Sequence, residues 1–188
     1  MSGMNISTII LLVIAVLIVW LIAAYNRLVT LRNRKREALS DIDVQSKRRY
    51  DLIPNLVETV KGYMKQESGV LESVTRARTQ VMSAPGTPIE KASAENQFSG
   101  AIKSMFAVAE AYPDLKSNTN FIELQQELSD TENKMMAARR FYNSTVQDLN
   151  TAIQSFPSSL IANSFGFTPE KFFETSSEAE KQPVKVQF

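Results

Sequence analysis

The chain opens with a long apolar run. Residues 6–24 (ISTIILLVIAVLIVWLIAA) contain no charged side chain and very few polar ones. In an α-helix this run rises about 28 Å, close to the thickness of the hydrocarbon core of a bilayer. Residues 1–5 lack the basic residues of a cleaved signal peptide, and the chain has no Cys that could carry a lipid anchor. We therefore predict a transmembrane helix over residues 1–26.

Beyond this run, apolar residues recur at spacings of three and four, and no segment alternates with a period of two. The pattern is interrupted by polar residues between 27 and 52 and becomes dense from Ile53 to Val81. We predict a helical stalk over residues 27–52 and a helical bundle over residues 53–174, and we expect the first helix to continue as far as Val81.

Two clusters of turn-forming residues divide the remainder. The segment MSAPGTPIE (82–90) predicts the end of the first helix, with Thr87 and Pro88 opening a second helix over residues 89–111. The segment YPDLKSN (112–118) predicts another corner, followed by a helix over residues 114–156 that keeps an apolar stripe as far as Phe156. Short connections then predict an up-down-up arrangement, with the third long helix parallel to the first.

The fold class expected from these patterns is all-α. A transmembrane helix continues into a long kinked helix, which joins an antiparallel bundle of three or four helices with coiled-coil-like packing. Residues 175–188 contain few apolar side chains and are predicted to be disordered.

Charge changes this picture at one place. Five basic residues follow the apolar run with no acidic residue among them: Arg27, Arg32, Arg34, Lys35 and Arg36. The positive-inside rule places the bulk of the chain in the cytoplasm. The same residues suit contact with anionic lipid headgroups, although topology alone also explains them. The formal net charge is only +1, so we expect no nucleic-acid partner.

Composition also limits the chemistry. The chain contains neither Cys nor His, which excludes disulfides, Cys/His zinc sites and His-activated nucleophiles. Carboxylates such as Glu67 and Glu132 could line a metal site, but without His they are expected to be helix-surface residues. We predict no catalytic residue, no cofactor, no metal and no small-molecule substrate, and hence a protein that is not an enzyme.

Several long motifs occur in order along the chain: YNRLV, RRYDLIPNLVETVKGYMKQE, YPDLKSNTNFIELQQELSDTEN, ARRFYN and FFE. In these motifs the sequence resembles the bacterial LemA family. The resemblance implies a membrane-anchored helical bundle and carries over no catalytic residue. The matching positions are predicted to serve structure or assembly: Arg49, Asp51, Pro54, Asn55, Glu67, Tyr112, Pro113, Glu132, Asn133, Arg139, Tyr142 and Asn143.

Pro54 lies inside the second of these motifs, beside its most charged point. Proline removes a backbone donor and kinks a helix, so we predict that Pro54 redirects the chain from stalk to bundle. Arg48, Arg49 and Asp51 are predicted to pair with charges on the third long helix, where Glu132 and Arg139 lie seven residues apart. The alternative is that these charges are a solvated surface and Pro54 a tolerated kink.

Two functions fit these features. The first is a scaffold of the bacterial inner membrane that associates with copies of itself and organises or shapes the bilayer. The second is an adaptor whose C-terminal tail, with Val184, Val186 and Phe188, captures a membrane protease or another membrane-protein partner. Deleting residues 175–188 distinguishes the two, because a scaffold would still assemble and an adaptor would lose its partner.

Overall fold

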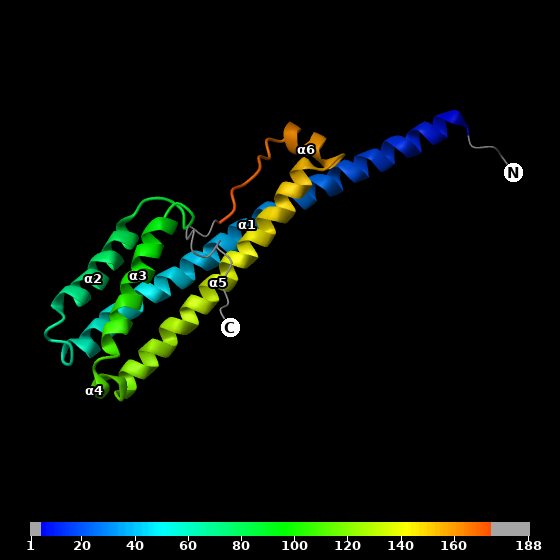
Figure 1. Cartoon of the computed structure of the whole chain (residues 1–188). Helices are drawn as coiled ribbons and strands as arrows, with labels where there is room; N and C mark the ends of the chain where they lie inside the picture. The colour runs from blue at the N-terminus through cyan, green and yellow to red at the C-terminus, as the bar shows by residue number, and fades with distance from the viewer. Residues whose placement is uncertain (1–4, 174–188) are drawn as a thin grey trace, which may run out of the picture. The chain divides into compact units, whose positions relative to one another are not determined.

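The computed structural model describes residues 5–173 of the chain. The elements within this part are all helices, as Figure 1 shows, so the all-α prediction is confirmed. In chain order they are α1 (Ile6–Lys61), α2 (Ser68–Ser83), α3 (Ala92–Ala109), α4 (Pro113–Lys116), α5 (Thr119–Gln154) and α6 (Ser158–Ser164). The predicted disordered tail, residues 175–188, lies outside the described residues.

Helix α1 begins in the apolar run and continues without a break to Lys61. Within residues 5–173 it is the one helix long and apolar enough to cross a membrane, and none of its most apolar window is buried by the protein. Pro54 lies inside α1 with an exposed side chain, so it does not end the helix. The change of direction expected at Pro54 stays a prediction.

The first helix ends at Lys61, twenty residues before the predicted end at Val81, which was wrong. Gly62 follows the last helical residue, and the chain reverses over residues 62–67, with the Met64 side chain fully buried in the turn. The prediction failed because Val60, Met64, Leu71 and Val74 keep the spacing of one continuous helix although they come from two.

This additional reversal also corrects the predicted topology. Residue pairs between α1 and α5 run in opposite order, because Asn118 donates a hydrogen bond to Tyr63 whereas Arg49 pairs with the later residue Glu132. Helix α5 is therefore antiparallel to α1, not parallel to it. Within residues 5–173, α1, α2, α3 and α5 enclose the core of this bundle, in agreement with the predicted three or four helices.

The other helix boundaries also differ from the prediction. Helix α3 begins at Ala92 rather than Ile89, because residues 88–91 form a turn in which the Glu90 carboxylate accepts the Thr87 N–H at 2.6 Å. Helix α5 begins at Thr119, where the Asn118 Oδ1 accepts the Phe121 N–H at 3.1 Å, a typical N-cap bond. Because α5 ends at Gln154, Phe156 leaves the apolar stripe and is 81% exposed.

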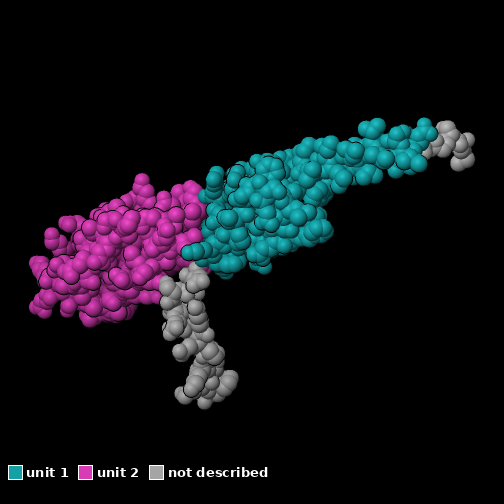
Figure 2. Space-filling model, turned by 90° about the horizontal axis from the view of Figure 1, so that it is seen from above, with its two compact units in different colours: residues 1–38, 140–172 teal, residues 39–139, 173–188 magenta. Residues whose placement is uncertain are grey.

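The described chain forms two compact units, coloured separately in Figure 2. Unit 1 contains residues 5–38 and 140–172, and unit 2 contains residues 39–139 and Phe173. Helices α1 and α5 thus contribute to both. Segments far apart in the sequence build each unit, so neither unit is a continuous stretch of chain.

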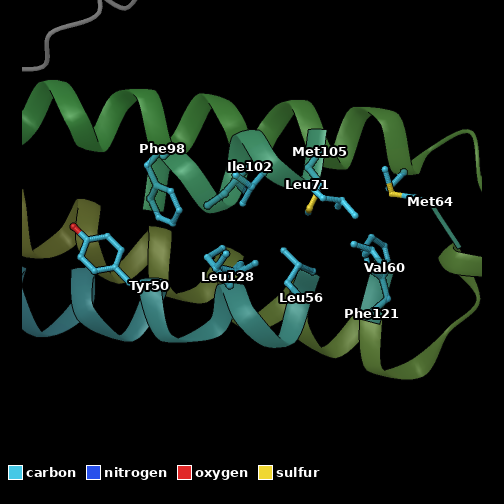
Figure 3. Close-up of a cluster of buried hydrophobic side chains, with 14 of the residues drawn as sticks. Tyr50, Leu56, Val60, Met64, Leu71, Phe98, Ile102, Met105, Phe121 and Leu128 are labelled. Carbon is cyan, nitrogen blue, oxygen red and sulfur yellow. The ribbon is translucent and has the colours of Figure 1, made fainter. Parts of the chain in front are cut away.

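The core of unit 2 is a packed cluster of large apolar side chains from α1, α2, α3 and α5 (Figure 3). Leu56, Val60, Phe98 and Met105 are fully buried. Each such side chain contributes about 1.5–3 kcal/mol by leaving water. The buried positions of α2 and α3 follow helical spacing, which is why these two segments fold as helices against α1.

The core of unit 1 is smaller. Leu28 and Leu31 of α1 pack with Leu149 and Ile153 of α5, and Ile161, Ala162 and Phe167 close the cluster. Residues 27–52, predicted as a stalk, therefore supply buried side chains to both units. Polar residues between these apolar positions make the stripe harder to recognise in the sequence than the one from Ile53 onward.

Candidate functional site

Four charged residues meet inside unit 2, and we call them the buried charge cluster: Arg49, Glu95, Glu132 and Arg139. Arg49 and Glu95 are only 4% and 3% exposed. The Arg49 Nη1 lies 2.8 Å from Glu132 Oε2 and 3.8 Å from Glu95 Oε2, and it donates a hydrogen bond to the Ser99 hydroxyl at 3.0 Å. One guanidinium therefore links three helices.

Helical spacing places each of these side chains. Arg49 follows Ile42 and Ser46 on the buried face of α1 and precedes Ile53 on the same face. Glu95 stands one turn before Phe98 on the buried face of α3. Glu132 and Arg139 lie two turns apart on α5. The cluster is thus a polar layer inserted into three apolar stripes.

The electrostatics of Glu95 are dominated by its burial. Loss of solvation raises the pKa of the Glu95 carboxyl group, and the positive charges of Arg49 and Arg139 and a hydrogen bond from Ser46 act in the opposite direction, while the Glu132 charge adds to the rise. The Tyr50 hydroxyl donates a hydrogen bond to Glu95 Oε1. Burial therefore makes the Glu95 carboxylate easier to neutralise than a carboxylate in water.

An aromatic ring lies against each of the two cations. The Arg49 guanidinium lies 5.2 Å from the centre of the Phe98 ring, and that ring meets Tyr50 edge to face at 5.5 Å. Arg139 lies 4.6 Å from the Phe173 ring. Because a helix slip would leave these charges buried without partners, the cluster fixes the register of α1, α3 and α5.

The predicted charge pairs are confirmed for two of the three residues beside Pro54. Arg49 pairs with Glu132, and Arg48 lies 3.7 Å from Glu127 in an exposed pair, both on α5. Asp51 is exposed and forms no ion pair among residues 5–173. The side chains of Pro54, Asn55 and Asn133 are also exposed.

The remaining predicted residues lie elsewhere. Glu67 and Tyr112 meet near the turns of unit 2, where the Tyr112 hydroxyl lies 3.5 Å from the Glu67 carboxylate, and Pro113 is the first residue of α4. Tyr142 and the half-buried Asn143 belong to unit 1. There the Tyr142 hydroxyl donates to the Lys171 carbonyl at 3.0 Å, and burial, with the nearby Glu170 charge, raises the pKa of Tyr142.

Sequence reasoning missed Glu95, together with Tyr50, Phe98 and Ser99. A signal was present: Glu95 is spaced by three and four residues from Phe98, Ile102, Met105 and Ala109, so it lies on the apolar stripe of α3. A carboxylate on such a stripe requires a partner, and Arg49 occupies the matching position on α1.

The basic residues after the apolar run separate into two groups. Lys35 pairs with Glu170 at 2.7 Å, and Arg32 lies over the Phe167 ring at 5.1 Å, so both contact unit 1 itself. Arg27, Arg34 and Arg36 are exposed. A shallow depression of about 480 Å³ is lined by Arg27, Thr30, Leu31, Arg34 and Asp148. Lipid contact by the basic residues stays a prediction, and the exposed Arg27, Arg34 and Arg36 are the residues to which it applies.

Two further predictions concern ligands. Within residues 5–173, no group of three or more carboxylates is close enough together to hold a metal ion. The predicted partner-binding residues Val184, Val186 and Phe188 lie outside the described part of the chain.

Comparison with known proteins identifies relatives over most of the chain. Protein LemA of Metamycoplasma hominis is 26% identical over 162 residues, which cover 85% of this chain and 72% of that protein. Magnetosome protein MamQ 2 of Paramagnetospirillum magneticum is 25% identical over 194 residues, covering 87% and 71%. Magnetosome protein MamQ of Magnetospirillum gryphiswaldense is 23% identical over 178 residues, covering 81% and 65%.

The family comparison covers a similar region. The model of the LemA family matches residues 38–188, which include α2 to α6 and the C-terminal part of α1. With the apolar segment of α1, this similarity indicates a membrane-associated protein. Since the match extends over well more than half of the sequence, the chain belongs to the LemA family.

Proposed function

We propose that this protein is a non-enzymatic, single-pass scaffold of the bacterial inner membrane, which associates with copies of itself and organises or shapes the bilayer. The attachment is supported by α1, whose apolar residues 6–19 are all exposed and suited to lipid. The orientation is supported by Arg27, Arg34 and Arg36, which are exposed directly after the span and favour a cytoplasmic location for the remainder.

The observation that carries self-association is one exposed face of α5 in unit 2. Seven residues that share this face by helical spacing are all exposed and all uncharged: Ile122, Gln125, Gln126, Ser129, Asn133, Met136 and Ala137. The neighbouring exposed face contains Glu123, Glu127, Asp130 and Lys134. We call the first set the uncharged face of α5.

The uncharged face has the properties of a contact between copies. Ile122 and Met136 lie fourteen residues apart, about 21 Å along the helix, and are 39% and 43% exposed. Depletion of charged residues is typical of the centre of a protein interface, where Met is also enriched. The predicted assembly residue Asn133 lies on this face. The buried charge cluster supports the same role, because it holds α5 in one register.

The particle mass of the full chain in lipid nanodiscs tests the proposal. The Ser129→Arg variant places a charge in the middle of the uncharged face, and a self-associating scaffold should then fall to a smaller particle. Ser73→Arg is the matched control, since Ser73 is an exposed serine on α2. A monomer for the unchanged chain, or the same mass for all three proteins, would overturn the proposed self-association.

The adaptor is the second candidate, and one feature of unit 2 favours it. An open groove of about 730 Å³ lies between the end of α1 and α2, and its lining includes the apolar Val57, Met64 and Leu71 and the charged Glu58, Lys61 and Glu72. A groove lined by apolar and charged side chains can hold a peptide segment. If the chain is monomeric and deletion of residues 175–188 abolishes capture of a membrane-protein partner, the adaptor replaces the scaffold.

A further inference from the structure

The corner between α5 and α6 in unit 1 exposes three large apolar side chains. Phe156 is 81% exposed, Leu160 is 60% exposed and Phe165 is 63% exposed. They lie within ten residues of one another, although Ile161, Ala162 and Phe167 of the same segment are buried. Such a surface is costly in water.

This corner belongs to an uncharged part of the chain. Residues 149–169 contain no Asp, Glu, Lys or Arg, whereas 22% of all residues are charged. Outside residues 1–26 it is the longest uncharged stretch in the sequence. Moving an uncharged segment out of water does not require the desolvation of any ionised group.

The contacts between α1 and the corner indicate how deep the corner would lie in a bilayer that α1 crosses. Trp20 and Ala24, in the last turns of the apolar run, pack against the unit 1 cluster that contains Leu149, Ile153, Ile161 and Phe167. The Tyr25 ring lies 4.8 Å from the Phe165 ring. If residues 6–24 cross the hydrocarbon core, the groups that touch Trp20 and Tyr25 must lie at the boundary where α1 leaves it.

The positions of the nearby basic residues agree with a corner that lies at the boundary of the hydrocarbon core. Lys35 and Arg32, which lie farther along α1, contact Glu170 and Phe167. Arg27 and Arg34 remain exposed beside the shallow depression described above. Apolar groups thus accompany the end of the span, and exposed arginines follow at the level of the headgroups.

We propose that the α5–α6 corner, residues 155–165, is a second membrane contact that inserts into the interfacial region of the bilayer beside α1 (Figure 1). The occupant of the exposed apolar surface is lipid, because the surface is continuous with the membrane-crossing helix through Tyr25 and Trp20. The inference rests on the proposed span of α1. It adds that unit 1 is held against the bilayer at two points, which restricts the tilt and rotation of α1.

Site-specific labelling of the full chain tests this contact, and the absence of Cys from the sequence removes any background. Leu160→Cys carries an environment-sensitive fluorophore in vesicles of phosphatidylcholine and phosphatidylglycerol. Phe141→Cys is the matched control, because Phe141 is an exposed apolar residue of unit 1 on α5, about 20 Å along the helix from its end. Val13→Cys reports the span itself.

Lipids with a nitroxide near the headgroup should quench the label at position 160 several-fold more strongly than the label at position 141. Equal quenching at 160 and 141, with strong quenching at 13 by lipids that carry the nitroxide on the acyl chain, would overturn the second contact and leave the span intact. If a label at 160 were protected from iodide in solution but not quenched by lipid, a second copy would cover the corner and the proposal would be wrong. Failure at position 13 would instead refute the proposed membrane attachment.

Discussion

Both units are built from α1 and α5, yet they treat their polar and apolar groups differently. Unit 2 encloses Arg49 and Glu95 in its interior and pairs Arg49 with both Glu95 and Glu132. Unit 1 keeps its ion pair at the edge, where Lys35 meets a Glu170 side chain that is 36% exposed, and leaves Phe156, Leu160 and Phe165 outside.

The difference shows where each unit obtains its specificity. The buried charge cluster of unit 2 permits one helix register, since a shift of one helix would leave a buried charge without its partner. Unit 1 has no equivalent layer in the part described, and its exposed apolar corner is explained by our proposal that lipid completes it. Helices α1 and α5 thus carry a buried charge cluster in unit 2 and an exposed apolar corner in unit 1.

The largest expected effect is the loss of stability when the buried ion pairs of Arg49 are removed, compared with removal of the ion pair between Lys35 and Glu170. Arg49→Met leaves Glu95 and Glu132 without their shared cation and should lower the free energy of unfolding by about 3–5 kcal/mol. Lys35→Met removes the peripheral pair of unit 1 and should cost about 1 kcal/mol or less. Chemical denaturation in mild detergent, followed by circular dichroism, measures both. Equal losses would remove the distinction between the units.

The second effect concerns the core of unit 1. Phe167 is 8% exposed and contacts Tyr25 and Arg32, so Phe167→Ala should cost about 3 kcal/mol. Trp20 is the single tryptophan of the chain and packs against this cluster, so its fluorescence reports unit 1 selectively. Phe172→Ala is the control, because Phe172 is 45% exposed and should change the fluorescence transition little. A transition insensitive to Phe167→Ala would contradict the observed packing.

A pH dependence is expected from unit 2 through Glu95. Burial raises the pKa of this carboxyl above its ordinary value of 4.5, so the folded state binds its proton more tightly than the unfolded state does. The resulting stabilisation is complete below about pH 4.5 and is lost as the pH rises through the folded pKa, by at most about 1.4 kcal/mol per pH unit.

The Glu95→Gln variant isolates this effect, because its side chain does not titrate. The stability of the unchanged chain relative to Glu95→Gln should fall as the pH increases above about 4.5 and then become constant. Groups facing Glu95 contribute to both proteins: Ser46, Arg49 and Tyr50 from α1, and Glu132 and Arg139 from α5. A difference that does not change between acidic and neutral pH would show that Glu95 is ionised as readily as in water.

The smallest effect tests a single hydrogen bond in unit 1. Tyr142→Phe removes the donor to the Lys171 carbonyl and should cost about 1 kcal/mol. Tyr63→Phe removes the acceptor of an exposed hydrogen bond from Asn118 in unit 2 and should cost less than half of that. Thermal unfolding of the two variants side by side measures the difference. A larger loss for Tyr63→Phe would show that exposure does not control these bonds.

Much of the secondary structure could be predicted from the sequence, because it depends on local patterns. Proline and glycine between residues 82 and 90 predict the turn after α2, and the apolar spacing predicts the buried faces of α3 and α5. The reversal at residues 62–67 was missed, because the apolar residues after the turn keep the helical spacing of those before it. Gly62 alone is a weak signal for a turn.

The candidate site could be predicted only in part. The motif residues Arg49 and Glu132 are brought together as expected, but Tyr142 lies in the other unit and Asn133 on the surface. Glu95 was missed, because a carboxylate on one helix is informative only when the facing helix is known.

By itself the sequence determined the all-helical class, the apolar membrane segment and its basic flank, and the absence of Cys and His, because each follows from composition or from spacing within one helix. Only the tertiary structure decided that α5 returns antiparallel to α1, that Glu95 completes the buried charge cluster, and that Arg32 and Lys35 contact the protein. These facts depend on contacts between residues far apart in the chain, and helical periodicity specifies which face is buried but not which face it meets.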